Sequence, residues 1–147
     1  MTSLAGKTVL YFEDQPEKVR GIEEMLQKKL GMEVLQAATR DQARECVSNN
    51  RLDLIILDIR ILNDDKPDEE GRDWRRTGLY FLRDLRAGKF PGVTPSGVPV
   101  LVITCVVNTA DVAEILEAGN ANGGECLYLA KPVRLAPVEN AVRKLIR

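Results

Sequence analysis

Histidine is absent from the chain of 147 residues, and its absence excludes several chemistries. Without an imidazole there is no histidine phosphocarrier, no Ser-His-Asp or Cys-His catalytic site, and no zinc or haem site that requires a histidine ligand. Any reaction that this protein carries out must therefore use carboxylates, hydroxyls, amines or thiols.

Cysteines are few, and no two of them are spaced as a CxxC pair. The chain has three, Cys46, Cys105 and Cys126, at irregular spacing. This odd number argues against a disulfide framework and predicts reduced thiols, as in the cytosol. No apolar run approaches the roughly 18 residues that a membrane helix needs, and residues 1–7 do not form a secretory signal. We therefore expect a cytoplasmic protein.

An excess of charge of one sign is also missing. The 21 lysines and arginines nearly balance the 22 aspartates and glutamates, which gives a formal net charge of −1. Proteins that bind nucleic acid or a membrane surface through bulk charge carry a basic excess or a basic face, so we expect neither partner. The length and the apolar fraction of 44% are ordinary for one globular domain, and we expect residues 1–147 to form one domain.

Short apolar runs alternate with segments of helical spacing along the chain. The apolar runs predict strands at 8–12, 33–38, 52–57, 98–103 and 126–130. Helical spacing and end signals predict helices at 16–30, 41–49, 79–85, 112–119 and 135–146. Since crossovers between parallel strands are right-handed, this alternation predicts an α/β fold of the (βα)5 type, a doubly wound parallel five-stranded sheet with helices on both faces.

Polar residues directly follow four of the five predicted strands. They are Glu13 and Asp14 after the first strand, Asp58 after the third, Thr104 after the fourth and Lys131 after the fifth. Ligands of open parallel sheets bind at the carboxyl ends of the strands. In the strand order 2-1-3-4-5 these four strands are neighbours, so we expect three carboxylates, a hydroxyl and an ammonium in one pocket.

Three carboxylates in one pocket repel one another, and a divalent cation would relieve that repulsion. Oxygen ligands from two or three carboxylates suit Mg²⁺, a hard ion that keeps several waters and often binds phosphate oxygens. Lys131 would then pair with an anion beside the metal, and the Thr104 hydroxyl would donate a hydrogen bond to it. This combination around Asp58 points to phosphoryl transfer.

Four motifs occur in a fixed order and, with the order of the elements, cover nearly the whole chain. They are Glu13-Asp14-Gln15-Pro16, Leu54-Ile55-Ile56-Leu57-Asp58, Val100-Leu101-Val102-Ile103-Thr104 and Tyr128-Leu129-Ala130-Lys131-Pro132. No single motif is specific, but the ordered set resembles the receiver domain of two-component response regulators. The resemblance implies the flavodoxin-like receiver fold. Because the last predicted helix ends with the chain, we expect a stand-alone receiver.

The resemblance implies a role for each acidic residue. Asp58 would be the phosphoacceptor, which attacks a phosphoryl group and forms an acyl phosphate. Glu13 and Asp14 would hold Mg²⁺, or Mn²⁺, together with Asp58 and the backbone carbonyl of Arg60. The phosphoryl donor would be a histidine kinase or a histidine phosphotransfer protein.

The resemblance also implies how the signal would be relayed. Lys131 would pair with Asp58 or a phosphoryl oxygen, Thr104 would move toward the phosphoryl group, and Tyr128 would change rotamer with it. The Lys131–Pro132 peptide commonly has the cis form in this family. The domain would catalyse its own phosphorylation and dephosphorylation without being a conventional enzyme, and a protein partner would receive the signal. A homodimer is left open.

Several features depart from the family's pattern. An inserted loop at about 63–76 separates Asp58 from Gly78, the glycine expected a few residues after the acceptor, and the loop at about 120–125 is lengthened. The insert is either a solvated loop or a lid or docking segment. Arg60, two residues after the acceptor, could reach the phosphoryl oxygens or obstruct attacking water, and Cys105 could narrow the access of the phosphodonor.

Two other classes of function stay open. One is a receiver-shaped scaffold that is never phosphorylated, and the other is a small metal-dependent phosphatase. A phosphatase of the haloacid dehalogenase type would need a second acid where Arg60 stands. The chain has no GxxxxGK[ST] or GxGxxG loop for a nucleotide, and Glu13-Asp14 would repel the phosphate of a flavin.

Overall fold

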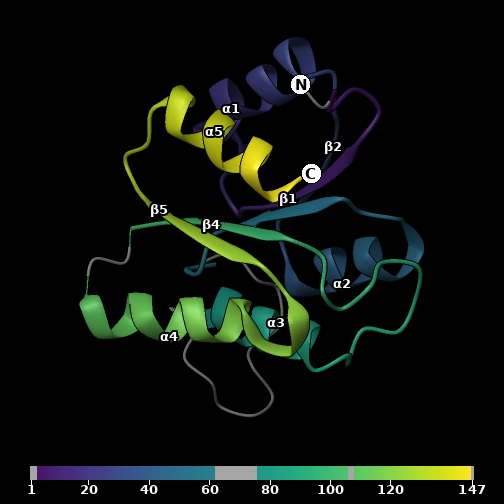
Figure 1. The fold of residues 1–147 in the computed structure, drawn as a ribbon, viewed down its shortest axis with the longest axis vertical. Helices are drawn as coiled ribbons and strands as arrows, with labels where there is room; N and C mark the ends of the chain where they lie inside the picture. The colour runs from purple at the N-terminus through teal and green to yellow at the C-terminus, as the bar shows by residue number, and fades with distance from the viewer. Residues whose placement is uncertain (1–2, 62–75, 106–107, 147) are drawn as a thin grey trace.

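A parallel sheet of five strands in the order β2-β1-β3-β4-β5 lies at the centre of the molecule (Figure 1). The structure is a computed structural model, and it describes residues 3–61, 76–105 and 108–146. The strands are β1 (Thr8–Phe12), β2 (Glu33–Ala37), β3 (Leu54–Leu57), β4 (Val100–Thr104) and β5 (Cys126–Ala130). The predicted α/β fold with this strand order is therefore confirmed.

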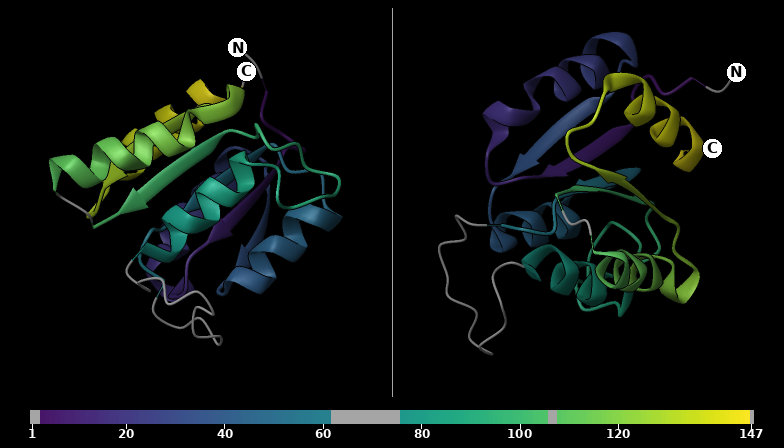
Figure 2. Two further views of the ribbon diagram at one scale, coloured as in Figure 1. Left: turned by 90° about the horizontal axis from the view of Figure 1, so that it is seen from below. Right: turned by 90° about the vertical axis from the view of Figure 1, so that its left-hand side faces the viewer.

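Helices cover both faces of the sheet, which lies between two helical layers in the right-hand view of Figure 2. One layer consists of α1 (Arg20–Glu24) and α5 (Leu135–Leu145). The other consists of α2 (Arg40–Asn49), α3 (Thr77–Arg86) and α4 (Thr109–Gly119). Each layer covers its own apolar cluster, so the sheet is buried on both faces.

The helical segment after β1 changes its hydrogen-bond pattern along its length. It begins with a 3-10 turn, η1 (Pro16–Val19), continues as α1 and ends with a π turn, η2 (Met25–Lys29). The backbone N–H of Leu30 donates to the carbonyl of Met25 at 3.1 Å. Gly31 then ends the segment at a φ of 70°, which glycine adopts without strain. The predicted helix is present, but as three kinds of turn.

Two strands begin two residues later than the sequence predicts. Asp53 lies in a bend before β3, where its Oδ2 accepts a hydrogen bond from the backbone N–H of Thr8 at 2.9 Å. The N–H of Val98 donates to the carbonyl of Pro95 at 3.1 Å, and Pro99 has no N–H to donate, so β4 begins at Val100. Apolar character alone does not show where strand pairing starts.

The four residues of β3 are fully buried and point alternately to the two clusters. Leu54 and Ile56 pack on the α1 and α5 side, whereas Ile55 and Leu57 pack on the α2, α3 and α4 side. Burial stabilises each of these side chains by about 1.5–3 kcal/mol. The strand that precedes Asp58 is therefore firmly held from both faces.

Gly78 allows α3 to begin directly against the end of β3. Its N–H donates to the carbonyl of Ile59 at 2.8 Å. A Cβ on Gly78 would lie 2.2 Å from the carbonyl oxygen of Asp58 and 2.7 Å from the Cα of Ile59. No side chain fits at this distance from backbone atoms. Close packing therefore explains why a glycine stands at position 78.

Arg86 is a buried cation at the opposite edge of the sheet, and sequence reasoning missed it. Its guanidinium donates to the carbonyls of Gly119 at 2.7 Å, Ser96 at 2.8 Å, Val98 at 2.6 Å and Glu125 at 3.1 Å. Burial lowers the pKa of Arg86. The four carbonyls satisfy the buried donors and join the end of α3 to the end of α4 and to the loops before β4 and β5.

Hydrogen bonds hold the loop at 120–125 against the neighbouring elements. It contains a short 3-10 turn, η4 (Ala121–Gly123), and the Asn122 side chain donates to the carbonyl of Arg86 at 2.9 Å. The Asn120 side chain accepts from the backbone N–H of Cys126 at 3.0 Å. Of the insert predicted at 63–76, only Arg76 lies within the described residues.

None of the described helices is long and apolar enough to cross a membrane. The three cysteines are free thiols: Cys126 is buried, Cys46 is half-buried and Cys105 is exposed. The expectation of reduced thiols agrees with this arrangement.

We predict that Arg86→Met lowers the free energy of unfolding by about 2–4 kcal/mol, because four carbonyls, two of them in buried hydrogen bonds, lose their donor. Urea unfolding followed by circular dichroism measures this change. Arg83→Met is the matched control on the same helix. Arg83 pairs with Glu114 at 2.7 Å on an exposed surface, so its loss should cost no more than about 0.5 kcal/mol. Equal effects of the two substitutions would contradict the role of Arg86.

We predict that Gly78→Ala lowers the free energy of unfolding by about 1–3 kcal/mol, because a methyl group there overlaps the backbone of Asp58 and Ile59, directly after β3. Gly21→Ala is the control. Gly21 lies in α1 with no atom within 4 Å of the added Cβ, and alanine should stabilise that helix by about 0.5–1 kcal/mol. Calorimetric unfolding of both variants tests whether Gly78→Ala lowers and Gly21→Ala raises the free energy of unfolding.

Candidate functional site

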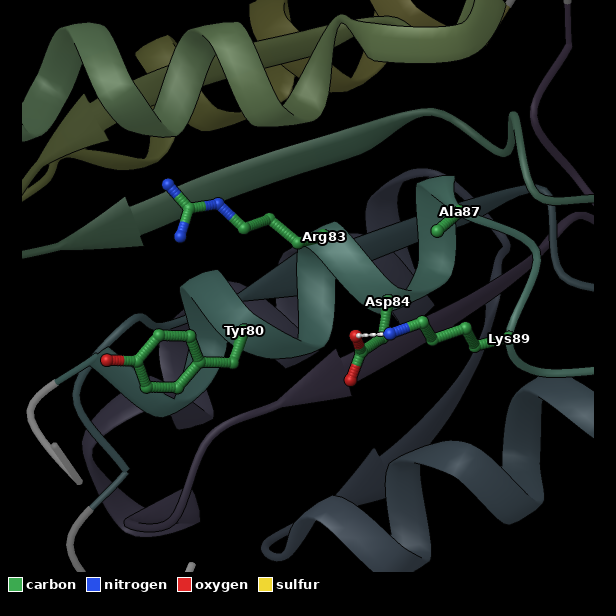
Figure 3. Close-up of a pocket in the computed structure, with 5 residues that line it drawn as sticks. All are labelled: Tyr80, Arg83, Asp84, Ala87 and Lys89. Carbon is green, nitrogen blue, oxygen red and sulfur yellow. Dashed lines mark ion pairs between the residues drawn. The ribbon is translucent and has the colours of Figure 1, made fainter. Parts of the chain in front are cut away.

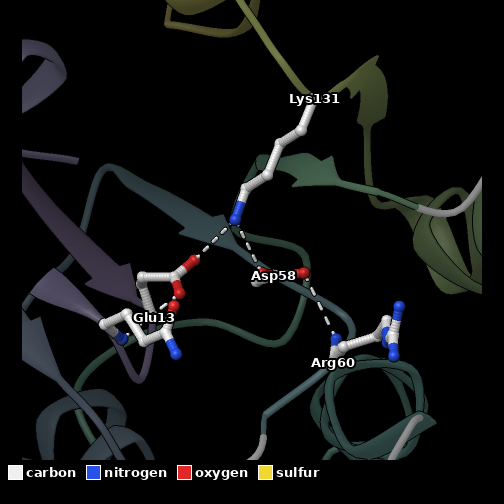
Figure 4. Close-up of polar contacts among 5 residues, drawn as sticks. Glu13, Asp58, Arg60 and Lys131 are labelled. Atoms are coloured by element: carbon white, nitrogen blue, oxygen red, sulfur yellow. Dashed lines mark hydrogen bonds and ion pairs between the residues drawn. The ribbon is translucent and has the colours of Figure 1, made fainter. Parts of the chain in front are cut away.

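Three of the site residues predicted from the sequence meet at the carboxyl edge of the sheet (Figure 4). Glu13 directly follows β1, Asp58 follows β3 and Lys131 follows β5. Each backbone N–H continues the strand pairing by one step: Glu13 donates to Ala37, Asp58 to Phe12 and Lys131 to Thr104, at 3.0, 3.1 and 2.9 Å. The sheet itself therefore fixes the bases of these three side chains.

The Lys131 ammonium lies between two buried carboxylates. Its Nζ is 2.8 Å from Oδ2 of Asp58 and 3.1 Å from Oε2 of Glu13. Asp58 is 6% exposed and Glu13 is 5% exposed, so water screens these charges weakly. The lysine links the ends of β1 and β3 to the loop after β5.

Backbone donors hold the other oxygen of each carboxylate. Oδ1 of Asp58 accepts from the backbone N–H of Arg60 at 3.2 Å. Oε1 of Glu13 accepts from the backbone N–H of Gln15 at 3.2 Å. Each carboxylate thus has one oxygen on the ammonium and one on the main chain, an arrangement that fixes its orientation.

Burial and the neighbouring charges shift the pKa values in this pocket. Burial and, next, the charge of Asp58 raise the pKa of Glu13 to about 8, and the opposing attraction of Lys131 only partly offsets them. Burial lowers the pKa of Lys131, but its hydrogen bonds and charge interactions with Asp58 and Glu13 outweigh burial, so that pKa is raised overall. The pocket therefore carries more acidic groups than one ammonium compensates.

Thr104 ends β4 and is completely buried, with an exposed fraction of 0%. Its hydroxyl has no hydrogen-bond partner among the described residues, although its backbone carbonyl accepts from Lys131. A buried hydroxyl without a partner costs free energy, and in a native protein it calls for an explanation such as a functional role. Thr104 is thus a donor without an acceptor next to the lysine.

The remaining predicted residues lie close by but contribute differently. Asp14, directly after Glu13, is buried. The Arg60 side chain and the Cys105 side chain are exposed. Tyr128 is half-buried on β5, two residues before the partner of Thr104 in the pairing of β4 and β5, so both side chains face α4. Burial raises the pKa of Tyr128, and Cys105 adds to that shift.

The donor set fits a hard cation that needs few protein ligands. No group of three Asp, Glu, His or Cys side chains among the described residues forms a complete metal cage. Mg²⁺ commonly binds one or two protein carboxylates and keeps several of its waters. Glu13 and Asp58 supply two carboxylates, and both accept a hydrogen bond from Lys131. Burial and the charge of Asp58 both disfavour the ionised form of Glu13, and a bound cation would offset both effects.

The sequence does not predict a role for one further residue near the site. Tyr11, two residues before Glu13, was assigned only to the apolar core of the first strand. Its hydroxyl is buried and has no hydrogen-bond partner among the described residues. The signal in the sequence is a single phenol inside an otherwise apolar run.

A surface hollow of about 380 Å³ lies on α3, away from this site (Figure 3). It is lined by Tyr80, Arg83, Asp84, Ala87 and Lys89. Its Lys89 and Asp84 are paired with each other at 3.4 Å. None of the residues predicted to carry chemistry lines the hollow, so it does not compete with the carboxyl edge as the candidate site.

Solved structures of known proteins resemble the whole chain. The receiver domain of a sensor histidine kinase from Pseudomonas aeruginosa PAO1, described with a magnesium ion coordinated in its active site cleft, has 28% sequence identity and a TM-score of 0.69, and the match covers 97% of this chain and 98% of that one. A two-component response regulator from Clostridium difficile has 20% identity and a TM-score of 0.72, with 96% of each chain covered.

A third similar structure is the chemotaxis protein CheY4 of Vibrio cholerae, with 23% identity, a TM-score of 0.69 and coverage of 96% of this chain and 99% of that one. No curated protein matches the sequence. The Lys131–Pro132 peptide is cis, as the resemblance to receivers implied.

The sequence profile of the response regulator receiver domain matches residues 9–143, which include all the site residues described above. The order of the strands and the acidic residues, threonine and lysine at their ends agree with that match. The chain belongs to the response regulator receiver domain family.

Proposed function

We propose that residues 1–147 act as a single receiver domain, in which Asp58 accepts a phosphoryl group in an Mg²⁺-dependent reaction. The observation that carries this proposal is the position of the Lys131 ammonium, 2.8 Å from the Asp58 carboxylate and 3.1 Å from Glu13. A cation there can compensate the charge of an incoming phosphoryl group beside the acceptor.

The phosphoryl donor in this proposal is the phosphohistidine of a histidine kinase or of a histidine phosphotransfer protein. A carboxylate oxygen of Asp58 forms a bond to phosphorus, and the phosphorus–nitrogen bond breaks. The electron pair of that bond returns to the imidazole, which takes up a proton, and Asp58 becomes an acyl phosphate. Water later attacks the phosphorus, which releases inorganic phosphate and regenerates the carboxylate. The domain therefore hydrolyses only the phosphoryl group that it carries itself, and it acts on no separate substrate.

Glu13, Asp14, Asp58 and the backbone carbonyl of Arg60 would hold the metal, Mg²⁺ or Mn²⁺. The metal would supply positive charge to the oxygens of the transferred group. The magnesium described in the Pseudomonas receiver supports this assignment. Lys131 would shift from Glu13 toward the phosphoryl group, because the metal takes over the neutralisation of Glu13.

The relay would run through Thr104 and Tyr128. The buried Thr104 hydroxyl has no partner among the described residues, so a phosphoryl oxygen would give it an acceptor. Movement of Thr104 would favour a new packing of Tyr128 against α4, and a protein partner that binds this packing more tightly would receive the signal. We propose a cytoplasmic location and leave a homodimer open.

A receiver-shaped scaffold that is never phosphorylated is the second candidate. The exposed Arg60 side chain, two residues after Asp58, favours it, because a cation at this position could compete with Lys131 for the acceptor. The intact acidic residues and the buried threonine favour the phosphoacceptor instead.

Incubation with Mg²⁺ and acetyl phosphate should add one phosphoryl group to the chain, as measured by intact mass. Asp58→Asn should abolish this gain, because an amide oxygen does not form the acyl phosphate. Asp84→Asn, on the surface of α3, is the matched control and should keep the gain. No gain in the wild-type chain would favour the scaffold, and turnover of added phosphoesters would favour a phosphatase.

Arg60→Ala should shorten the lifetime of the acyl phosphate, because a long cation beside Asp58 obstructs the attacking water. A change of about threefold corresponds to about 0.7 kcal/mol in the barrier. The loss of mass after removal of the phosphodonor measures the lifetime. Arg51→Ala, at the opposite end of β3, serves as the control. An unchanged lifetime in Arg60→Ala would contradict this role.

A further inference from the structure

Only two buried side-chain polar atoms in the described part of the chain have no hydrogen-bond partner: the hydroxyls of Thr104 and Tyr11. The receiver mechanism gives Thr104 an acceptor but gives none to Tyr11. Tyr11 is 2% exposed, so its hydroxyl is shielded from bulk solvent. A phenylalanine would fill the same space without the cost of an unpaired donor, and the hydroxyl therefore needs an explanation.

The strand geometry places Tyr11 beneath the carboxylates of the site. Side chains two residues apart on a strand share a face, so Tyr11 and Glu13 face the same side of β1. Tyr11 pairs with Ile56, and Phe12 pairs with Leu57. One residue further along each strand, Glu13 and Asp58 therefore lie side by side. Tyr11 packs in the cluster under α1 and α5, and Lys131 enters from the loop before α5.

The electrostatic surroundings keep the phenol protonated. Burial raises the pKa of Tyr11, and the charges of Glu13, Asp58 and Glu23 raise it further. The hydroxyl is therefore a neutral donor among three carboxylates. Glu23 already accepts a hydrogen bond from the side chain of Gln36.

The acceptor on the same strand face is Glu13, but its oxygens are occupied in the present state. Oε2 accepts from Lys131 and Oε1 accepts from the backbone of Gln15. A divalent cation beside Glu13 would repel the Lys131 ammonium, and the carboxylate would then lose one of its two donors. Groups that orient a metal-binding carboxylate are themselves hydrogen-bonded as a rule.

We propose that Tyr11 is a positioning residue, whose hydroxyl donates a hydrogen bond to the Glu13 carboxylate once Mg²⁺ has displaced Lys131 from it. This inference rests on the proposed function. The hydroxyl is unpaired without the metal and paired with it, so it favours the metal-bound state and increases the affinity for Mg²⁺.

The test is the substitution Tyr11→Phe, which removes only the hydroxyl. Titration calorimetry with Mg²⁺, in the absence of any phosphodonor, should show about tenfold weaker binding than in the wild-type chain. Without metal, the unfolding temperature should be unchanged or higher, because phenylalanine removes an unpaired polar group. Tyr80→Phe, on α3, is the matched control and should change neither quantity.

The outcomes separate this inference from the proposed function. Equal Mg²⁺ affinity of Tyr11→Phe and the wild-type chain would overturn the role of Tyr11 and leave the receiver function standing. A wild-type chain that binds no Mg²⁺ would overturn both. A loss of affinity together with a lower unfolding temperature in the absence of metal would assign the hydroxyl a structural role and overturn the inference.

A second background identifies the acceptor. Glu13→Asp keeps a carboxylate but shortens its side chain, which moves the oxygens away from the position that Tyr11 would serve. If Tyr11 acts through Glu13, adding Tyr11→Phe to Glu13→Asp should no longer weaken Mg²⁺ binding. A tenfold loss that persists in this background would assign the hydroxyl to another group and overturn the proposal.

Discussion

The ion pair of one lysine with two buried carboxylates organises the whole carboxyl edge of the sheet. Lys131 comes from the loop after β5, whereas Glu13 and Asp58 follow β1 and β3, so the contact crosses the position of β4. A cation between two buried carboxylates offsets their mutual repulsion. Strand pairing fixes the backbone positions of Glu13 and Asp58, and the Lys131 ammonium holds their carboxylates close together.

Much of this arrangement could be predicted from the sequence because the fold converts chain order into spatial order. A parallel sheet brings every strand's carboxyl end to one edge, so polar residues directly after apolar runs identify the site without knowledge of any contact. Glu13, Asp58 and Lys131 follow from that rule. The strand starts do not, because Asp53 and Val98 lie within the predicted strands but form hydrogen bonds before strand pairing begins, and composition does not reveal those bonds.

The residues missed by sequence reasoning share a physical property. Arg86 and Tyr11 are polar groups whose importance lies in burial, and burial of a single side chain depends on contacts between distant segments. An arginine near the end of a helix normally points to solvent, and Arg86 is satisfied instead by carbonyls from residues up to 39 positions away. The hydroxyl of a buried tyrosine usually has a hydrogen-bond partner, and the hydroxyl of Tyr11 has none among the described residues.

The carbonyl contacts of Arg86 also determine the geometry of any displacement of α4. One of these carbonyls belongs to Gly119, the last residue of α4, so a rotation of α4 about that end would move its first residue, Thr109, furthest. Its 11 residues give an arm of about 16 Å, so a rotation of about 10° would carry Thr109 through about 3 Å. The displacement of α4 would be largest beside the carboxyl edge of the sheet and smallest at the Arg86 guanidinium.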